Sequence, residues 1–327
     1  MTLLFLLSKE NLNIAKAEVE ALIGEKCALD KNIALFEEKK IKTNKNFTLN
    51  VCKRAAYTHG IFNVLFISNY KNIEKDIKKF NWNKIYKKSF VVRKTGYNKS
   101  LIKKENEYAK FIWQKINNPK VNLNGACTKI FLVCGKKVYV CLMLCETDKS
   151  YLLRKPHLRP YLHPTSLNPK LARAMVNFTG ANEEDVICDP FCGSGGILIE
   201  AGLMGIKTIG IDISEKMLKM AAHNLKHYKI KNFKLIKKDA TKIKINANYV
   251  VTDLPYGKGS KITERLEDLY FKFLKNLKNS NIKKSIIGFP NFVNYKKLVK
   301  KSGLKIENQF EQYIHKNLSK IIIILKR

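Results

Sequence analysis

The chain has 327 residues, of which 45% are hydrophobic and 27% are charged. This length is typical of two or three domains, and the apolar content is sufficient for real cores, which excludes a mainly disordered chain. No apolar run approaches the roughly 20 residues of a membrane-spanning helix. Residues 1–7 also lack the basic segment and the small-residue cleavage site of a signal peptide. We therefore expect a soluble, cytoplasmic protein with no membrane partner.

Basic residues outnumber acidic residues by 62 to 27, which gives a formal net charge of +35. The excess is uneven: it is +1 over residues 1–50, +15 over residues 51–150, 0 over residues 151–200 and +19 over residues 201–327. A general lysine enrichment, as in proteins from hot habitats, would spread evenly along the chain. The uneven distribution favours a nucleic-acid partner over a merely solvated surface.

Eight cysteines lie at positions 27, 52, 127, 134, 141, 145, 188 and 192, and none of them forms a Cys-x-x-Cys pair. This spacing argues against a zinc ribbon, and we expect no metal. A chain of this length does not need a disulfide framework. The cysteines are therefore predicted to be buried thiols in a reducing compartment.

The first half alternates short strands and helices. Ser8 is a candidate cap for the first helix, and Gly24 is a candidate stop. The triplet Gly135-Lys136-Lys137 is typical of a hairpin turn. Hydrophobic periodicity predicts strands at 2–7, 33–36, 47–51, 61–67, 90–93, 130–134 and 138–145, and helices after Ser8 and at 53–59, 73–79 and 103–116.

The second half follows residues 147–162, a proline-containing segment without periodicity that we interpret as a linker. Beyond it, strands and helices alternate strictly, which indicates an open, mostly parallel sheet with helices on both faces. The predicted strands are 186–189, 208–213, 233–237, 249–252, 284–288, 304–310 and 321–325, and the predicted helices are 197–204, 216–228, 265–277 and 295–302.

A glycine-rich turn follows the first strand of this second half. The strand ends at Asp189, and Gly193, Gly195 and Gly196 come directly before the next helix. These glycines allow the backbone to approach a ligand at the carboxyl end of the sheet. The turn matches neither the dinucleotide fingerprint nor the phosphate loop of nucleotide triphosphatases. On its own it is equally consistent with a tight turn.

Two further carboxylates lie at the ends of the next two strands. Asp212 is placed where it can accept both hydroxyl groups of a ribose, and Asp239 where it can accept an adenine amino group. Single acids of this kind are more often solvated or helix-capping. Three acids in corresponding positions favour a nucleoside-binding site.

The fourth strand ends in Asp253-Leu254-Pro255-Tyr256. An exocyclic amine conjugated to a base is a poor nucleophile. If the Asp253 carboxylate and the Leu254 carbonyl accept its two hydrogens, its lone pair is held away from the ring and can attack. Tyr256 offers a flat surface for an extruded base, and Pro255 stiffens the turn. The alternative is an ordinary turn that caps a strand.

These motifs resemble those of Rossmann-like S-adenosylmethionine-dependent methyltransferases that act on amino groups. The resemblance covers residues 163–327 and implies a mostly parallel seven-stranded sheet. It assigns Asp253, Leu254, Pro255 and Tyr256 to catalysis; Leu254 departs from the commoner Pro but still offers its backbone carbonyl. It implies that S-adenosylmethionine contacts His163, Thr165, Asp189, Phe191, Gly193, Ser194, Gly195, Gly196, Asp212, Ile213, Asp239 and Ala240.

The whole chain is also similar to archaeal tRNA guanine-N2 methyltransferases with a THUMP domain, in particular the guanosine-10 enzymes. The segments that carry this similarity are residues 15–22, 54–59, 89–93, 159–175 and 315–321. It implies an N-terminal α+β half, with a ferredoxin-like domain at 1–50 and a THUMP RNA-binding domain at 51–146. The linker at 147–162 and the methyltransferase domain at 163–327 then follow.

The resemblance implies a tRNA substrate. We expect Lys79, Lys87, Lys88, Arg93 and Lys94 to contact its phosphates, which position the RNA without reading its sequence. The expected product is N2-methylguanosine at position 10, and a second methylation is left open. Alternatives are guanosine 6 of tRNA, an rRNA guanine, an amine in DNA, or a non-catalytic RNA-binding module. We expect a monomer.

Overall fold

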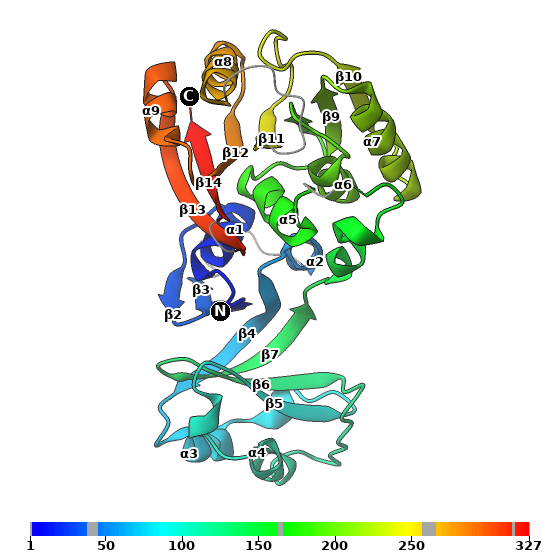
Figure 1. Cartoon of the computed structure of the whole chain (residues 1–327). Helices are drawn as coiled ribbons and strands as arrows, with labels where there is room; N and C mark the ends of the chain where they lie inside the picture. The colour runs from blue at the N-terminus through cyan, green and yellow to red at the C-terminus, as the bar shows by residue number, and fades with distance from the viewer. Residues whose placement is uncertain (1, 38–44, 163–165, 257–265, 316–317, 327) are drawn as a thin grey trace. The chain divides into compact units, whose positions relative to one another are not determined.

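The computed structural model divides the chain into two compact units, Met1–Asp148 and Lys149–Arg327 (Figure 1). It describes residues 2–37, 45–162, 166–256, 266–315 and 318–326. The division falls inside the segment interpreted as a linker. The predicted boundary after residue 50 lies within helix α2 (Lys45–Arg54), so the finer division into ferredoxin-like and THUMP domains stays a prediction.

The first unit is built on one seven-stranded sheet with the order β2-β3-β1-β4-β7-β6-β5. Its strands are β1 (Thr2–Leu7), β2 (Ala28–Asp30), β3 (Ile33–Glu37), β4 (Thr58–Ser68), β5 (Phe90–Gly96), β6 (Thr128–Cys134) and β7 (Val138–Glu146). Only β5 and β6 run parallel; all other neighbouring strands in this sheet are antiparallel. The hairpin predicted around Gly135 is confirmed as the β6–β7 turn.

The helices of this unit are α1 (Leu12–Ile23), α2, α3 (Ile73–Lys79) and α4 (Glu105–Trp113), with short 3-10 turns at Trp82–Lys84 and Lys99–Leu101. Helices α3 and α4 cover the β5–β6–β7 part of the sheet (Figure 1). Their residues Ile77, Tyr108 and Ile112 lie in one buried core with Phe90 of β5. The predicted cap Ser8 is wrong, because the Asn11 side chain accepts the Ile14 N–H at 3.2 Å.

The prediction is also wrong at residues 47–51, which form part of helix α2 and not a strand. Alternating Phe47, Leu49 and Val51 resembled a half-buried strand, but the same stretch also has helical spacing. Val51 and Cys52 are buried, and α2 packs on β7. Tertiary packing thus overrides a five-residue pattern, and residues 53–59 are divided between the end of α2 and the start of β4.

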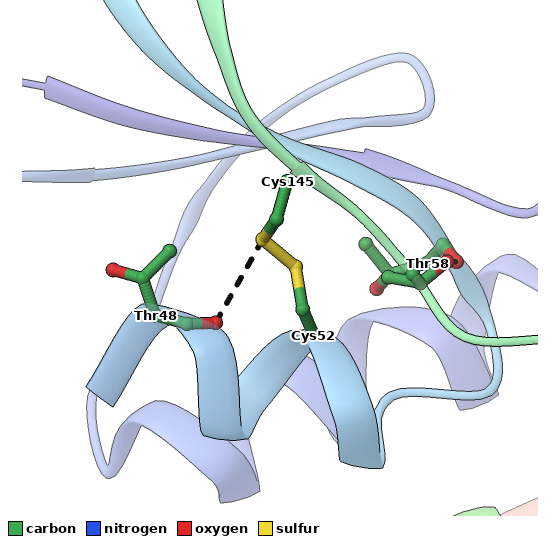
Figure 2. Close-up of a disulfide and its surroundings, with 5 residues drawn as sticks. Thr48, Cys52, Thr58 and Cys145 are labelled. Atoms are coloured by element: carbon green, nitrogen blue, oxygen red, sulfur yellow. Dashed lines mark hydrogen bonds between the residues drawn. A yellow bond between two sulfur atoms is a disulfide. The ribbon is translucent and has the colours of Figure 1, made fainter. Parts of the chain in front are cut away.

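A disulfide joins Cys52 of α2 to Cys145 of β7, with Cα atoms 6.5 Å apart (Figure 2). The expectation that all the cysteines are free thiols is therefore wrong for this pair. The two residues are 93 positions apart, and nothing in their local spacing indicates the pairing. The other six cysteines are free. Four of them are buried, as predicted, but the prediction of burial is wrong for the half-buried Cys27 and the exposed Cys127.

The second unit contains the predicted α/β sheet, with the order β10-β9-β8-β11-β12-β14-β13. Its strands are β8 (Val186–Asp189), β9 (Lys207–Asp212), β10 (Phe233–Lys237), β11 (Tyr249–Asp253), β12 (Lys284–Pro290), β13 (Lys305–His315) and β14 (Leu318–Lys326). The first five strands are parallel, and β14 inserts antiparallel between β12 and β13. The prediction of a mostly parallel seven-stranded sheet is confirmed.

Helices cover both faces of this sheet (Figure 1). The helices are α5 (Pro169–Phe178), α6 (Gly196–Leu203), α7 (Glu215–His227), α8 (Leu266–Asn279) and α9 (Tyr295–Ser302), with 3-10 turns at Ser150–Arg154 and Pro156–Leu158. Side chains of α8 and α9 form one core with the sheet, and side chains of α6 and α7 form another. Residue 265, the predicted start of α8, lies outside the described residues.

The order of the strands reverses between β8 and β11. The chain runs outwards from β8 through β9 to β10, and then returns to place β11 on the other side of β8. Helices on the two sides of such a point diverge, which leaves a crevice at the carboxyl ends of the strands. Asp189 ends β8 and Asp253 ends β11, so both predicted acids lie at this point.

Candidate active site

The glycine-rich turn leads from β8 into α6. Gly193 and Gly195 have φ angles of +49° and +87°, in the left-handed region that favours glycine. Apart from its two neighbours in the chain, no described residue has an atom within 4 Å of the position that a Cβ of Gly193 would take. The turn therefore presents bare backbone to open space, as the motif predicted, and Ser194 lies buried within it.

Gly196 is glycine for a different reason. A Cβ there would lie 3.0 Å from Nη1 of the buried Arg159. The Arg159 Nε donates to the Arg154 carbonyl at 2.9 Å, and Arg154 forms an ion pair with the fully buried Glu200 of α6. Arg173 of α5 binds the same carboxylate at 2.9 Å. These ion pairs and hydrogen bonds join α6 to α5 and to the 3-10 turn at Ser150–Arg154.

Asp189 is 2% exposed and holds the turn together. Its Oδ1 accepts the Thr252 hydroxyl at 2.7 Å and the Phe191 N–H at 3.2 Å. Burial raises the pKa of Asp189 to about 7, although both hydrogen bonds act in the opposite direction. Among the positions predicted to bind the cofactor, Asp189 is thus placed to order the turn.

Asp212, at the end of β9, connects the turn to the next strand. Its Oδ2 accepts the Gly193 N–H at 2.9 Å, and its Oδ1 accepts the Ser214 N–H at 2.8 Å. Ile213 beside it is 71% exposed. An exposed apolar side chain next to a strand-end carboxylate suits a ligand that has a flat ring and hydroxyl groups.

Asp239 follows β10 and is partly exposed. Its Oδ1 accepts both the Thr241 N–H at 2.9 Å and the Thr241 hydroxyl at 2.7 Å. These bonds and the nearby Lys242 lower the pKa of Asp239, although burial raises it. Ala240 is buried. Asp212 and Asp239 thus follow neighbouring parallel strands, at the same edge of the sheet as the glycine-rich turn.

Three more residues are predicted to bind the cofactor, namely His163, Thr165 and Phe191. His163 and Thr165 lie outside the described residues. Ser166, which follows them, places its hydroxyl 2.9 Å from the Ser194 hydroxyl. Phe191 is half-buried and meets Phe273 edge to face, with ring centroids 5.0 Å apart. Phe191 therefore joins the turn to the α8 core.

The segment predicted to be catalytic, Asp253–Tyr256, begins at the last residue of β11. Asp253 Oδ1 accepts the Tyr256 hydroxyl at 2.9 Å. The Pro255 carbonyl accepts the Tyr270 hydroxyl, which fastens the turn to α8. Burial, and next the Asp253 carboxylate, raise the pKa of Tyr256, so its hydroxyl keeps its proton. The structure therefore brings all four predicted catalytic residues together at one strand end.

Leu254 has a buried side chain, and its N–H donates to the Gly288 carbonyl at 3.0 Å. In the parallel register of β11 and β12, the next ladder bond would run from residue 290 to the Leu254 carbonyl. Residue 290 is proline and has no N–H. The described part of the chain thus provides no backbone donor for the Leu254 carbonyl at this place, which leaves it available as an acceptor.

Sequence reasoning missed three residues of this site. Pro290 ends β12, and Gly288 lies opposite Asp253 in the ladder. Lys320 of β14 places its ammonium 2.5 Å from Asp253 Oδ2. Lys320 belongs to a segment whose family likeness was noted, but neither the likeness nor the local pattern gave it a role.

The predicted RNA-contacting residues lie in the first unit. Lys79, Lys87 and Lys88 are exposed. Arg93 lines a hollow of about 250 Å³ on the sheet, and its guanidinium donates to the Leu123 carbonyl at 2.9 Å. Lys94 instead donates to the carbonyls of the loop before α4, so it does not join Arg93 at the hollow.

The described residues contain no helix long and apolar enough to cross a membrane. Within the same residues, no three His, Cys, Asp or Glu side chains form a group that could hold a metal ion.

Two family models match the chain. The model described as an RMKL-like methyltransferase domain matches residues 156–319, and a DNA methylase model matches residues 12–223. Both describe methyltransferases. The first covers nearly all of the strands and helices that build the site.

Curated relatives are similar over most of the chain. The tRNA (guanine(10)-N2)-dimethyltransferase of Methanothermobacter thermautotrophicus is 31% identical over 84% of this chain and 84% of its own length. The protein of the same name from Pyrococcus abyssi is 34% identical over 76% of this chain and 78% of its own length. Among solved structures, TrmN from Thermus thermophilus aligns over 100% of both chains with a TM-score of 0.56 at 17% identity, which shows a shared fold.

Proposed function

The chain belongs to the tRNA (guanine(10)-N2)-dimethyltransferase family, and from this premise we propose that it methylates the N2 amine of guanosine 10 in tRNA with S-adenosylmethionine as the methyl donor. It is a methyltransferase by family. We infer the methyl donor, the target nucleotide and the roles of the site residues from the arguments below.

The residues at the carboxyl edge fit S-adenosylmethionine. The open space over Gly193 accommodates the methionine part of the cofactor, which can pass close to the backbone there. Asp212 and Asp239 offer carboxylates at the two positions where a ribose and an adenine need acceptors, and Ile213 offers an apolar surface for the ring. When bound, this cofactor supplies a methyl group activated by its attachment to a positively charged sulfur.

The protein's own contribution is to prepare the amine. Asp253 accepts one hydrogen of the N2 amine, and the Leu254 carbonyl accepts the other. The nitrogen lone pair is then directed away from the base and towards the methyl group. Asp253 also stabilises the positive charge that develops on N2, and the methylated amine afterwards releases its proton readily. Tyr256 provides the stacking surface for the base.

One observation carries this proposal: Asp253 and an available Leu254 carbonyl lie together at the strand reversal, beside the glycine-rich turn. Two acceptors on neighbouring residues suit an amine with two hydrogens. A module that only bound RNA would have no need of a proline that removes the competing N–H at residue 290.

We propose that the first unit, with residues 51–146 as its RNA-binding part, grips the tRNA through exposed basic side chains. Lys79, Lys87 and Lys88 have their ammonium groups in solvent, and such groups attract phosphate without reading bases. Arg93 lines the hollow on the sheet; its guanidinium binds the Leu123 carbonyl and pairs with Glu105 at 3.5 Å, and it has further N–H donors.

The test is methyl transfer from labelled S-adenosylmethionine to an unmodified tRNA transcript, followed by nucleoside analysis and mapping. We expect N2-methylguanosine, and N2,N2-dimethylguanosine after longer reaction, at position 10. The same nucleosides at position 6 would keep the chemistry and correct the target. Transfer to rRNA or DNA but not to tRNA would contradict the proposal.

A further inference from the structure

Lys320 differs from the other lysines of this lysine-rich chain. It is 5% exposed, and among the described residues it is the only lysine that is buried. Removing an ammonium group from water is costly unless the group finds a partner of opposite charge. A buried lysine at the catalytic strand end therefore requires a specific explanation.

The partner of Lys320 is the catalytic carboxylate. The Lys320 Nζ lies 2.5 Å from Asp253 Oδ2 and 5.1 Å from the centre of the Tyr256 ring. The other carboxylate oxygen, Oδ1, accepts the Tyr256 hydroxyl. Three side chains, from the end of β11, the turn after it and β14, thus form one cluster in which two donors bind the same carboxylate.

This pairing depends on a glycine in the strand between them. β12 lies between β11 and β14; Gly288 pairs with Asp253 on one side, and Pro290 pairs with Lys320 on the other. A Cβ at Gly288 would lie 2.6 Å from Asp253 Oδ1 and 3.4 Å from the Lys320 Cδ. The lysine therefore reaches Asp253 across a strand whose side chain is missing at that point.

We propose that Lys320 and Asp253 together read the Watson–Crick edge of guanine, with the Lys320 ammonium donating to O6. This inference rests on the proposed function. Guanine presents two donors, N2–H and N1–H, followed by the acceptor O6. Asp253 supplies acceptors for the donors, and Lys320, bound beside it, supplies the donor for O6. Adenine presents an acceptor at N1 and a donor at N6, which opposes this order.

The cluster has the capacity for these bonds. An ionised carboxylate has about four acceptor sites, and an ammonium has three donors. Within the described residues, hydrogen bonds from Tyr256 and Lys320 occupy two of the carboxylate sites, and Asp253 occupies one donor of Lys320. The pair is also neutral overall, so it can contact a neutral base without leaving a buried charge uncompensated.

The test uses two tRNA transcripts that differ only at position 10, which holds guanine or 2-aminopurine. 2-Aminopurine keeps the N2 amine but lacks both N1–H and O6. We expect wild-type protein to methylate guanine more than about 100-fold faster, because a site built to hydrogen-bond these groups rejects an analogue without them. Equal rates in the wild-type protein would contradict the proposal without any variant.

The second arm compares Lys320→Met with wild type on both transcripts. We expect the guanine rate to fall roughly 10- to 100-fold, the size of a lost hydrogen bond to a charged group. The 2-aminopurine rate should fall by a smaller factor, because only the guanine transcript also loses the bond to O6, so the preference for guanine shrinks. A lysine that only positions Asp253 would slow both substrates equally, and that result would contradict the proposal.

Lys284→Met is the matched control. Lys284 is a half-buried lysine of the same sheet, but it donates to the Phe178 carbonyl at 3.2 Å and not to Asp253. Its replacement should leave the ratio of rates unchanged. If Lys320→Met does not fold, Lys320→Gln keeps a neutral donor and should retain an intermediate preference for guanine; a full preference would contradict a role for the charge.

Failure of this inference and failure of the proposed function are distinguishable. If wild-type protein methylates the guanine transcript but Lys320→Met preserves the ratio of the guanine rate to the 2-aminopurine rate, the proposed function is supported. The proposal that Lys320 donates to O6 is then contradicted. If wild-type protein transfers no methyl group to the guanine transcript at all, the proposed function and this inference fall together.

Discussion

Both units bury carboxylates, but they use them differently. In the first unit, Asp30 accepts the Lys136 N–H with both oxygens and the Tyr139 hydroxyl at 2.8 Å. In the second unit, Asp253 accepts hydrogen bonds from two side chains and remains partly exposed, with 16% of its side chain accessible. Asp30 is 7% exposed and binds groups of its own unit, whereas the more accessible Asp253 keeps capacity for a substrate.

A glycine makes room for the carboxylate in each case. A Cβ at Gly135 would lie 2.5 Å from an Asp30 oxygen, and a Cβ at Gly288 would lie 2.6 Å from an Asp253 oxygen. A glycine opposite a carboxylate therefore serves a turn in one unit and the proposed catalytic cluster in the other. The difference lies in position, because Asp253 ends a parallel strand where the strand order reverses and Asp30 ends a short edge strand.

The largest effect is expected at Asp253. Asp253→Ala removes one of the two acceptors for the amine, and methyl transfer should fall by about 1,000-fold or more. A gel shift should still show tRNA binding, because the first unit is unchanged. The control is Asp185→Ala. Asp185 lies just before β8, at the opposite end of the parallel strands from Asp253, and its replacement should keep activity. Loss of tRNA binding in Asp253→Ala would contradict the assigned role.

Asp30→Ala should show the opposite behaviour. It leaves the Lys136 N–H and the Tyr139 hydroxyl without their acceptor, and should lower the free energy of unfolding by about 2–3 kcal/mol. Denaturant unfolding measures this loss. At saturating tRNA and a temperature where the variant is folded, kcat should equal that of wild type. A large fall in kcat would break the distinction between the two carboxylates.

Pro290→Ala tests the available carbonyl. Alanine restores an N–H that can donate to the Leu254 carbonyl and compete with the amine of the substrate. We expect kcat to fall about tenfold, equivalent to one net hydrogen bond, with unchanged binding of S-adenosylmethionine by calorimetry. A variant as active as wild type would show that the Leu254 carbonyl does not orient the amine.

The smallest effect concerns pH and Asp189. Burial raises its pKa to about 7 in the folded protein, well above the value of about 4 for an exposed Asp. The folded state therefore retains a proton that the unfolded state has released, and stability falls as the pH rises through 7. Relative to Asp189→Asn, wild type should lose about 1 kcal/mol between pH 6 and pH 8. Parallel stability profiles would contradict the raised pKa.

Local signals predicted the parts of the site that are continuous in sequence. Asp189, Gly193 and Asp253 could be placed because a strand end, a glycine turn and the start of a helix follow one another in the chain. The parallel sheet then brings successive strand ends to one edge, so short motifs determined where these residues meet.

What the sequence did not reveal depends on contacts between distant residues. Lys320 is 67 positions from Asp253, and only the strand order brings them together. The Cys52–Cys145 disulfide is missed for the same reason. Helix α5 was missed because its segment follows a proline-containing linker, although Asn168 and Pro169 form a typical N-terminal helix signal.

The most direct test of the central claim uses two tRNA transcripts, one with guanosine and one with inosine at position 10. Inosine lacks only the N2 amine and keeps N1–H and O6. With labelled S-adenosylmethionine, we predict that label enters position 10 of the guanosine transcript and is absent from the inosine transcript. Equal labelling of both transcripts would show that the acceptor is a different atom, and would contradict the account.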